Sequence, residues 1–230
     1  MLNRRQVAGG LAAFASSTAF AQEWPTKAVR IVVPFGAGGI ADLTARAVGD
    51  ALATRTGKPV IIDNKPGAGG VVAGEAVAHA EPDGHTLLLI SNGTAVSSGL
   101  FKHLPFDALR DFAPVSLIGV FQLGVLVAAN SPFQSLDGLL AAAKSKPGKL
   151  NIATINAGST QNLAAELFKS TEGIDVQVVP FNGTPAVITA LRGGQVDAGI
   201  EILGPVKTQV ASGALSMLAT MEKYGVSSWN

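Results

Sequence analysis

Five short segments rich in Gly, Ser, Thr and Asn carry the groups of this sequence best suited to chemistry. They are almost uncharged and occupy residues 35–39, 65–70, 91–94, 156–160 and 181–183. Glycine lets backbone N–H groups approach a ligand closely, and a helix N-terminus carries about half a positive charge. Ser159 and Thr160 add hydroxyl donors at one expected helix start. This pattern favours binding of a carboxylate or another small oxyanion without Lys or Arg.

Two other interpretations of these segments stay open. Each segment taken alone is also typical of ordinary turn and capping residues. Gly36-Ala37-Gly38-Gly39 resembles part of a dinucleotide-binding fingerprint, and Asp63 follows a strand at about the required 20 residues, but position 41 is Ala where the fingerprint has its third Gly. The sequence contains no G-x-x-x-x-G-K-[ST] phosphate-binding loop.

Groups that break bonds are scarce. His79, His85 and His103 have no partner at the i, i+4 spacing of helical metal ligands, and no G-x-S-x-G nucleophile elbow occurs. The absence of cysteine excludes disulfides, thiol nucleophiles and thiolate metal sites. Asp197 and Glu201 are four apart and like-charged, unlike an acid–base pair. We therefore expect no catalytic residue, no metal, no cofactor and no enzymatic activity.

Alternating strand and helix signals would position the five segments. Short apolar strands are expected at 29–33, 60–62, 86–90, 123–128, 150–154, 176–179 and 215–219. Helices are expected at 40–56, 71–80, 136–145, 161–171 and 185–191. Strands that are apolar throughout indicate a parallel sheet covered on both faces, whose ligands bind beyond the carboxyl ends of the strands. We predict an α/β fold of two doubly wound units, joined by a segment after Phe101.

Two details bear on this division. Val33-Pro34-Phe35-Gly36 and Val179-Pro180-Phe181-Asn182-Gly183 each end a strand, turn on Gly and start a helix, as two similar lobes facing one cleft would do. The uncharged stretch 112–136 is interrupted by Pro and Gly. We therefore interpret its Ser-Leu-Ile (116–118) and Val-Leu-Val (125–127) as two buried strands rather than a membrane span.

The first 21 residues have the features of an export signal. Arg4 and Arg5 precede an uncharged run over 7–21, which closes with the small-x-small pattern Ala19-Phe20-Ala21. We predict Sec-type export with cleavage before Gln22, and the arginine pair leaves twin-arginine export open. The 230-residue chain has a formal net charge of +1 and no larger basic cluster, which argues against nucleic-acid binding. We expect a periplasmic protein.

Several motifs of the chain follow one another as in a known family. They include Val-Pro-Phe-Gly-Ala-Gly-Gly at 33–39, and they lie within residues 30–42, 64–70, 82–89, 111–115, 147–151, 179–183 and 193–196. In order and spacing they resemble the Bug (TctC-like) proteins, the extracytoplasmic solute receptors of tripartite tricarboxylate transporters. The resemblance covers residues 24–219.

The resemblance implies a two-lobed periplasmic binding protein (type II-like), each lobe a doubly wound sheet with helices on both faces, closing on a small organic anion. Family members hold a carboxylate with the loop that here is 158–161, add a water-mediated contact from 35–39, and complete the cleft wall with other loops. The implied ligand-binding residues are Phe35, Gly36, Ala37, Gly38, Gly39, Asp42, Ser91, Asn92, Thr94, Gly158, Ser159, Thr160, Gln161, Asn182, Gly183 and Glu201. Glu201 would suit a ligand with a hydroxyl or ammonium group.

The implied division is a signal peptide at 1–21, a first lobe at 22–105, a second lobe at 106–220 and an atypical tail at 221–230. Family members continue beyond the strand expected at 215–219 into a segment that completes the first lobe. We therefore expect a C-terminally truncated receptor, with an incomplete first lobe, exposed apolar surface and lower stability than a full-length relative.

The implied partners are a small organic acid (a di- or tricarboxylate, an amino acid or an aromatic acid) and the membrane permease subunits of the transporter. We expect a monomer that binds no nucleic acid. Two alternatives remain: a secreted α/β enzyme that uses the Gly-rich segments for a phosphorylated substrate, and a non-functional remnant.

Overall fold

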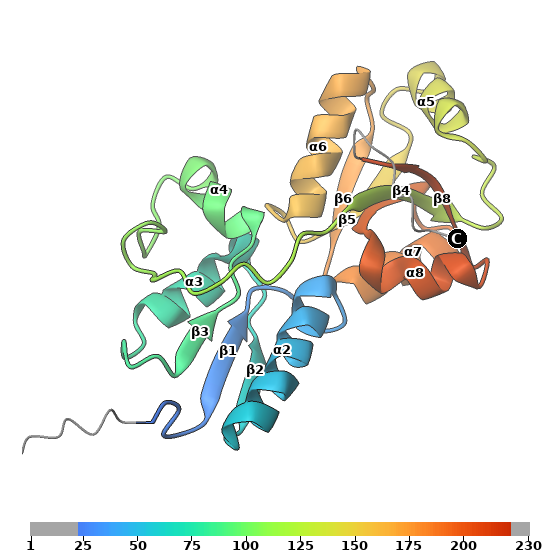
Figure 1. Ribbon diagram of the computed structural model, residues 1–230. Helices are drawn as coiled ribbons and strands as arrows, with labels where there is room; N and C mark the ends of the chain where they lie inside the picture. The colour runs from blue at the N-terminus through green and yellow to red at the C-terminus, as the bar shows by residue number, and fades with distance from the viewer. Residues whose placement is uncertain (1–22, 222–230) are drawn as a thin grey trace, which may run out of the picture.

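The computed structural model describes residues 23–221, which form two lobes built around separate sheets (Figure 1). We call the elements from β1 to α4 lobe one and those from β4 to β8 lobe two. The predicted α/β, two-lobed architecture is confirmed. The predicted signal peptide lies outside the described residues, as does the tail after Met221.

Lobe one contains a parallel three-stranded sheet in the order β2-β1-β3. Its elements are β1 (Val29–Val33), α2 (Ile40–Thr56), β2 (Val60–Asn64), the 3₁₀ turn η1 (Ala68–Gly70), α3 (Val71–Ala78), β3 (Thr86–Leu88) and α4 (Asn92–Leu100). The β-branched residues of β1 favour the central strand, and α2 ends where Gly57 adopts the left-handed conformation at φ 66°. Figure 1 shows α2 on one side of this sheet and α3 on the other.

Lobe two contains a mixed five-stranded sheet in the order β6-β5-β7-β4-β8. Its elements are β4 (Leu123–Ala128), α5 (Leu136–Ser145), β5 (Asn151–Ile155), α6 (Thr160–Glu172), β6 (Gln177–Phe181), α7 (Thr184–Arg192), β7 (Ala198–Ile202), α8 (Leu203–Ala211) and β8 (Leu215–Thr220). Strands β5, β6 and β7 are parallel, whereas β4 is antiparallel to both β7 and β8. One core cluster lies under α5 and α6, and another lies under α7 and α8.

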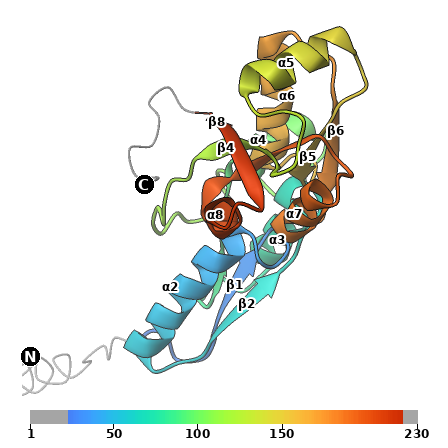
Figure 2. The same cartoon turned by 90° about the vertical axis from the view of Figure 1, so that its right-hand side faces the viewer.

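The second of these core clusters joins the two lobes. It contains Val33 and Phe35 of lobe one together with Ile155, Val187 and Leu203 of lobe two, all buried. Figure 2, turned by 90° from Figure 1, shows the upper end of α2 pointing at α8. The lobes therefore meet through packed side chains as well as through loops.

The structure corrects the sequence prediction in several places. Besides the short 3₁₀ turn η1, three elements were not expected: α4, which begins inside the segment predicted as a loop at 91–94, β7 and α8. The strand predicted at Ser116–Ile118 is wrong, because these residues belong to no strand and the Leu117 side chain is 81% exposed. No strand among the described residues pairs with this stretch through backbone hydrogen bonds, and apolar residues alone do not form a sheet.

Residues 109–121, here called the apolar connector, link the two lobes (Figure 1). They carry several exposed apolar side chains. Leu109, Val115 and Val120 are 92%, 82% and 85% exposed. Just before the connector, Phe106 is buried against α3, where a Cβ at Gly74 would lie 2.5 Å from its ring. Within residues 23–221, no helix is long and apolar enough to cross a bilayer.

Candidate functional site

Loops from both lobes meet between the two sheets. A Cβ placed on Gly36 would lie 3.7 Å from the carbonyl oxygen of Asn182, and one placed on Gly69 would lie 3.6 Å from the carbonyl oxygen of Ala157. Most of these loops leave the carboxyl ends of parallel strands, where ligands of α/β sheets bind. We call them the loop cluster, which comprises residues 35–39, 65–70, 91–94, 156–160 and 182–184.

The close approach of these loops requires glycine at position 93. A Cβ at Gly93 would lie 2.8 Å from the carbonyl oxygen of Gly158 and 3.1 Å from that of Gly69. Both neighbours are backbone atoms, which cannot rotate away as a side chain can. The two lobes are therefore joined here through bare backbone.

Four helices begin in the loop cluster without a side-chain cap. The N-cap residues of α2, α3, α4 and α7 are Gly39, Gly70, Ser91 and Gly183, and none of them makes a side-chain capping hydrogen bond. The first amides of a helix have no acceptor within the helix, and they carry its positive partial charge. These helix ends therefore present N–H donors to a shared region, which suits an anion.

Helix α6 begins differently, because Ser159 caps it. The Ser159 hydroxyl accepts a hydrogen bond from the Asn162 amide at 3.1 Å and donates one to the Ile155 carbonyl at 2.8 Å. Its side chain is fully buried. The Ser159 hydroxyl is thus engaged in the fold, which leaves the amides of Thr160 and Gln161 as the donors of this helix end.

Three polar side-chain atoms of the loop cluster are buried without a hydrogen-bond partner in the described part of the chain. They are Ser91 Oγ, Thr94 Oγ1 and Asn156 Oδ1. Thr94 is only 1% exposed, and its Oγ1 lies 3.0 Å from the Cβ position of Gly70. An unsatisfied buried polar group costs about 1–3 kcal/mol, so such groups are rare and require an explanation.

A hydrogen-bonded clamp holds the 35–39 loop from both ends. Asp42 Oδ2 accepts from the Gly38 amide at 2.9 Å, and Asp42 Oδ1 lies 2.9 Å from Arg46 Nη2. Arg46 Nη2 reaches Asn64 Oδ1 at 3.4 Å, and Asn64 Nδ2 donates to the Phe35 carbonyl at 3.0 Å. The loop is therefore fixed before any ligand arrives.

Asp42 stays charged in this clamp. Burial raises its pKa, but hydrogen bonds from Arg46, Gly38 and Asn64 together lower it below the ordinary 3.8. Asp42 is 2% exposed, and both of its oxygens are held by groups of lobe one. Within this geometry the contacts of Asp42 position the loop.

Glu201 lies beneath the loop cluster in lobe two and is completely buried. Its Oε2 accepts from Gln161 Nε2 and Thr184 Oγ1, each at 3.2 Å, and from the Ile202 amide at 3.3 Å. Its Oε1 has no partner among the described residues. Burial outweighs the three hydrogen bonds and raises the pKa of Glu201 to about 7.

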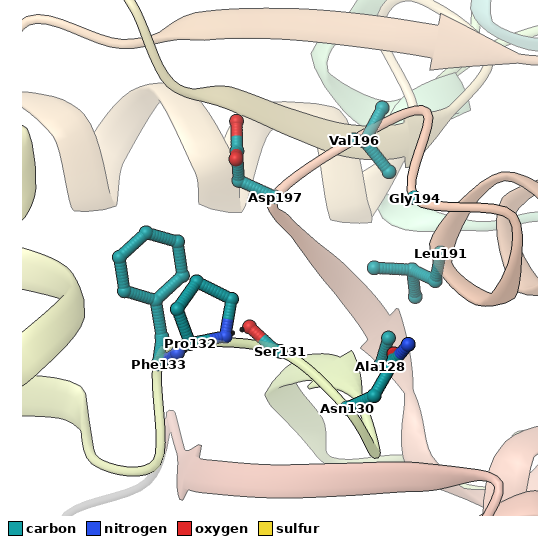
Figure 3. Close-up of a pocket in the computed structure, with 9 residues that line it drawn as sticks. All are labelled: Ala128, Asn130, Ser131, Pro132, Phe133, Leu191, Gly194, Val196 and Asp197. Atoms are coloured by element: carbon teal, nitrogen blue, oxygen red, sulfur yellow. Dashed lines mark hydrogen bonds between the residues drawn. The ribbon is translucent and has the colours of Figure 1, made fainter.

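A hollow of about 200 Å³ lies elsewhere, at the far end of the lobe-two sheet (Figure 3). Ala128, Phe133 and Asp197 are among its lining residues. Because β4 is antiparallel to β7 and Leu123 pairs with Ile202, Ala128 lies at the opposite end of the sheet from Glu201. This hollow is therefore separate from the loop cluster.

The model of the family described as "Tripartite tricarboxylate transporter family receptor" (TctC) matches residues 44–227 of the chain. This chain belongs to the TctC receptor family. Two relatives from Bordetella pertussis agree: a UPF0065 protein is 35% identical over 95% of this chain and 68% of its own length, and the protein BugT is 35% identical over 87% and 62%. The chain thus spans about two thirds of the length of these relatives.

Solved structures of TctC-type proteins show the same fold. R. palustris Rpa4515 with adipate has a TM-score of 0.83 and 31% identity, covering 87% of this chain and 68% of its own. MatC from Rhodopseudomonas palustris with bound malate has a TM-score of 0.79 and 32% identity over the same shares. Periplasmic binding protein BugD has a TM-score of 0.80 and 27% identity, covering 88% of this chain and 68% of its own. The family is one of solute-binding receptors rather than of enzymes.

In this TctC receptor chain, nearly all the predicted site residues lie in the loop cluster, with Asp42 one turn into α2 and Glu201 beneath. Ala37, Asn92 and Asn182 are exposed at its edge. Sequence reasoning missed Thr184, which is 1% exposed, and the roles of Asn64 and Asn156. Thr184 directly follows a flagged segment, Asn182-Gly183, so its place at a helix start was the available signal.

Proposed function

We propose that this chain is a periplasmic solute-binding receptor that captures a small organic carboxylate between its lobes and passes it to a tripartite tricarboxylate transporter permease. The observation that carries the proposal is the set of unpartnered atoms Ser91 Oγ, Thr94 Oγ1 and Asn156 Oδ1 beside uncapped helix starts from both lobes. A bound anion would satisfy them together.

The chemistry of the loop cluster favours an oxyanion over a cation. Its donors are amides and hydroxyls, and its nearest carboxylates have other roles, since Asp42 is neutralised by Arg46 and Glu201 has a raised pKa. The similar structures of Rpa4515 with adipate and of MatC with bound malate support a dicarboxylate here. Because donors come from both lobes, the ligand would hold them together.

The alternative is a secreted α/β enzyme or nucleotide-binding protein that uses the same Gly-rich loops. A ligand panel on the purified 230-residue chain decides between them, with malate, adipate and citrate tested against ATP and NAD. A ligand that binds only the folded state stabilises it by RT ln(1 + [L]/Kd) and therefore raises Tm. We expect the carboxylates to raise Tm and the nucleotides to leave it unchanged. A Tm increase with nucleotides alone would contradict the proposal.

Thr94→Val tests the site itself. Valine keeps the shape and volume of threonine but removes the unpartnered hydroxyl, so affinity for the best carboxylate should fall about 10-fold while the folded chain is at least as stable. Thr171→Val is the matched control, because Thr171 is exposed at the far end of α6. Equal calorimetric affinities for the two variants would place the ligand elsewhere.

Export, permease coupling and a monomeric state form part of this proposal. Spheroplast fractionation should recover the chain in the periplasmic fraction, cleaved before Gln22. Size-exclusion chromatography with light scattering should give a single-chain mass. Retention of the uncleaved chain in the cytoplasm would contradict the proposed location.

A further inference from the structure

The two oxygens of the Glu201 carboxyl group have opposite surroundings. Three donors converge on Oε2, namely Gln161 Nε2, Thr184 Oγ1 and the Ile202 amide, at 3.2–3.3 Å. Oε1 has no hydrogen-bond partner among the described residues, and the side chain is completely buried. A half-satisfied buried carboxyl group is costly, and the imbalance requires a physical reason.

Glu201 lies directly behind the proposed ligand site. Gln161 is in the first turn of α6 and Thr184 is the first residue of α7, so both donors come from helix starts in the loop cluster. Thr184 Oγ1 also lies 3.5 Å from the Cβ position of Gly39, the N-cap of α2 in lobe one. The carboxyl group is thus one side chain away from the junction of the lobes.

Burial, and not the donors, favours a neutral acid here, because the three hydrogen bonds to Oε2 lower the pKa and burial outweighs them. The donors decide which oxygen carries the proton of the neutral form: all three lie on Oε2, which therefore accepts, and the proton belongs on Oε1, which has no donor facing it among the described residues. Oε1–H would then be a buried donor that lacks an acceptor. An ionised Glu201 would instead place a second negative charge beside the site of an anion.

We propose that Glu201 binds the ligand as a neutral acid, donating Oε1–H to an oxygen of the captured carboxylate, so that ligand binding takes up one proton from solvent. This inference rests on the function proposed above. It makes Glu201 a hydrogen-bond donor that selects acceptor-bearing ligands, rather than a partner for a ligand ammonium group.

The electrostatic surroundings support this role. Burial raises the pKa of Glu201 to about 7, and no charged neighbour contributes to that shift. Strands β4 and β5 carry no charged residue, and β7 carries no other. Charged groups also lie on the helices that pack on this sheet and on α2 at the junction of the lobes. They are Asp137, Lys144, Glu166, Lys169, Glu172, Arg192 and Lys207 on α5 to α8, and Asp42, Arg46, Asp50 and Arg55 on α2. Glu201 therefore exchanges its proton near neutral pH.

Calorimetry with malate and adipate on the full chain tests the proposal. Since only the protonated receptor binds well, affinity should fall about 10-fold between about pH 6 and about pH 8. Titrations in two buffers of different ionisation enthalpy should give nearly one proton taken up per ligand at the higher pH and nearly none at the lower. This count needs no variant and so does not depend on any substitution folding.

Glu201→Gln sharpens the test, because a glutamine amide offers the same carbonyl and a permanent donor. We expect its affinity at both pH values to match that of the wild type at the lower pH, with no proton uptake. Glu166→Gln, an exposed change on α6, should keep the wild-type pH dependence.

Three outcomes would count against these proposals, and they are distinguishable. Binding with the same pH profile in the wild type and Glu201→Gln would overturn the inference alone. So would an affinity that rises with pH for aspartate, which carries an ammonium group. No binding of any acid at any pH would overturn the proposed function and this inference with it.

Discussion

Ser91 of lobe one and Ser159 of lobe two occupy the same position, the N-cap of a helix that begins in the loop cluster, yet their hydroxyls differ. Ser159 caps α6 and also donates to the Ile155 carbonyl. Ser91 makes no capping bond, and its buried Oγ has no partner in the described structure. One serine is engaged in the fold, and the other is left available to a ligand.

The two buried carboxylates repeat this contrast with the lobes exchanged. Asp42 in lobe one forms an ion pair with Arg46 and holds its own loop in place. In lobe two, no cation lowers the pKa of Glu201, and one of its oxygens has no hydrogen-bond partner within residues 23–221. Each lobe therefore combines a satisfied polar group that holds the backbone in place with an unsatisfied one. The difference shows that residue type and position in the sequence do not by themselves separate structural from ligand-facing roles.

The largest expected effect comes from Gly93→Ala, which removes the close approach that brings the lobes together. The new Cβ would lie 2.8 Å from the Gly158 carbonyl oxygen, and overpacking of this kind costs about 1–3 kcal/mol. Carboxylate affinity measured by calorimetry should fall up to about 100-fold. Gly99→Ala on the same helix meets nothing within 4 Å and should bind as the wild type does. Equal losses in both would indicate a helix effect instead.

The two carboxylates should give opposite pH dependences of stability. The pKa of Glu201 is raised from 4.5 to about 7, so stability present below about pH 4.5 is lost as pH rises through about 7, by at most about 3 kcal/mol. The pKa of Asp42 is lowered from 3.8, so its contribution is present above that value and is lost as pH falls through its folded-state pKa. Urea unfolding measured across this pH range should show that Glu201→Gln no longer loses stability as pH rises through about 7.

Ser159→Ala should affect folding more than binding. Loss of an N-cap hydroxyl costs about 0.5–2 kcal/mol, and here the Ile155 carbonyl also loses its donor. Thermal unfolding should show a lower Tm for this variant. The affinity of the folded fraction should stay close to that of the wild type, and a large loss of affinity at unchanged Tm would reverse the assignment of the two serines.

Ser91→Ala should do the opposite at a smaller scale. Removing an unpartnered buried hydroxyl relieves a cost in the unliganded chain, so Tm should stay constant or rise slightly. Carboxylate affinity should fall about 5-fold, because one ligand hydrogen bond is lost. A clear fall in Tm would show that Ser91 is a capping residue after all.

Much of the fold could be predicted from the sequence because most of its strands are short apolar runs, followed within a few residues by Gly-containing loops and then by helices. Strand β7 was missed because Ala-Gly-Ile-Glu-Ile contains a small start and a charged residue, and only tertiary burial makes Glu201 compatible with a central strand. Helix α4 was missed because Asn-Gly-Thr-Ala-Val-Ser-Ser-Gly-Leu has weak helix propensity. A strand was predicted within the connector because its apolar residues were interpreted as buried, whereas they are exposed.

The site was predictable at the level of loops and not of atoms. The residues of the loop cluster could be predicted because Gly-rich loops that follow parallel strands all lie at the same edge of the sheet. Which hydroxyl remains unpaired depends on a few tenths of an ångström in each loop, and Thr184 enters only because it reaches Glu201 from another helix. The sequence does not encode these distances in any local pattern.

The apolar connector has a practical consequence for anyone who purifies this protein. Side chains such as Leu109, Leu117 and Val120 meet water almost as freely as in an unfolded chain. We therefore expect concentrated solutions to aggregate and become turbid. A hydrophobic dye should bind and increase in fluorescence while circular dichroism still reports an intact fold. The double change Leu117→Lys and Val120→Lys should extend shelf life without changing carboxylate capture.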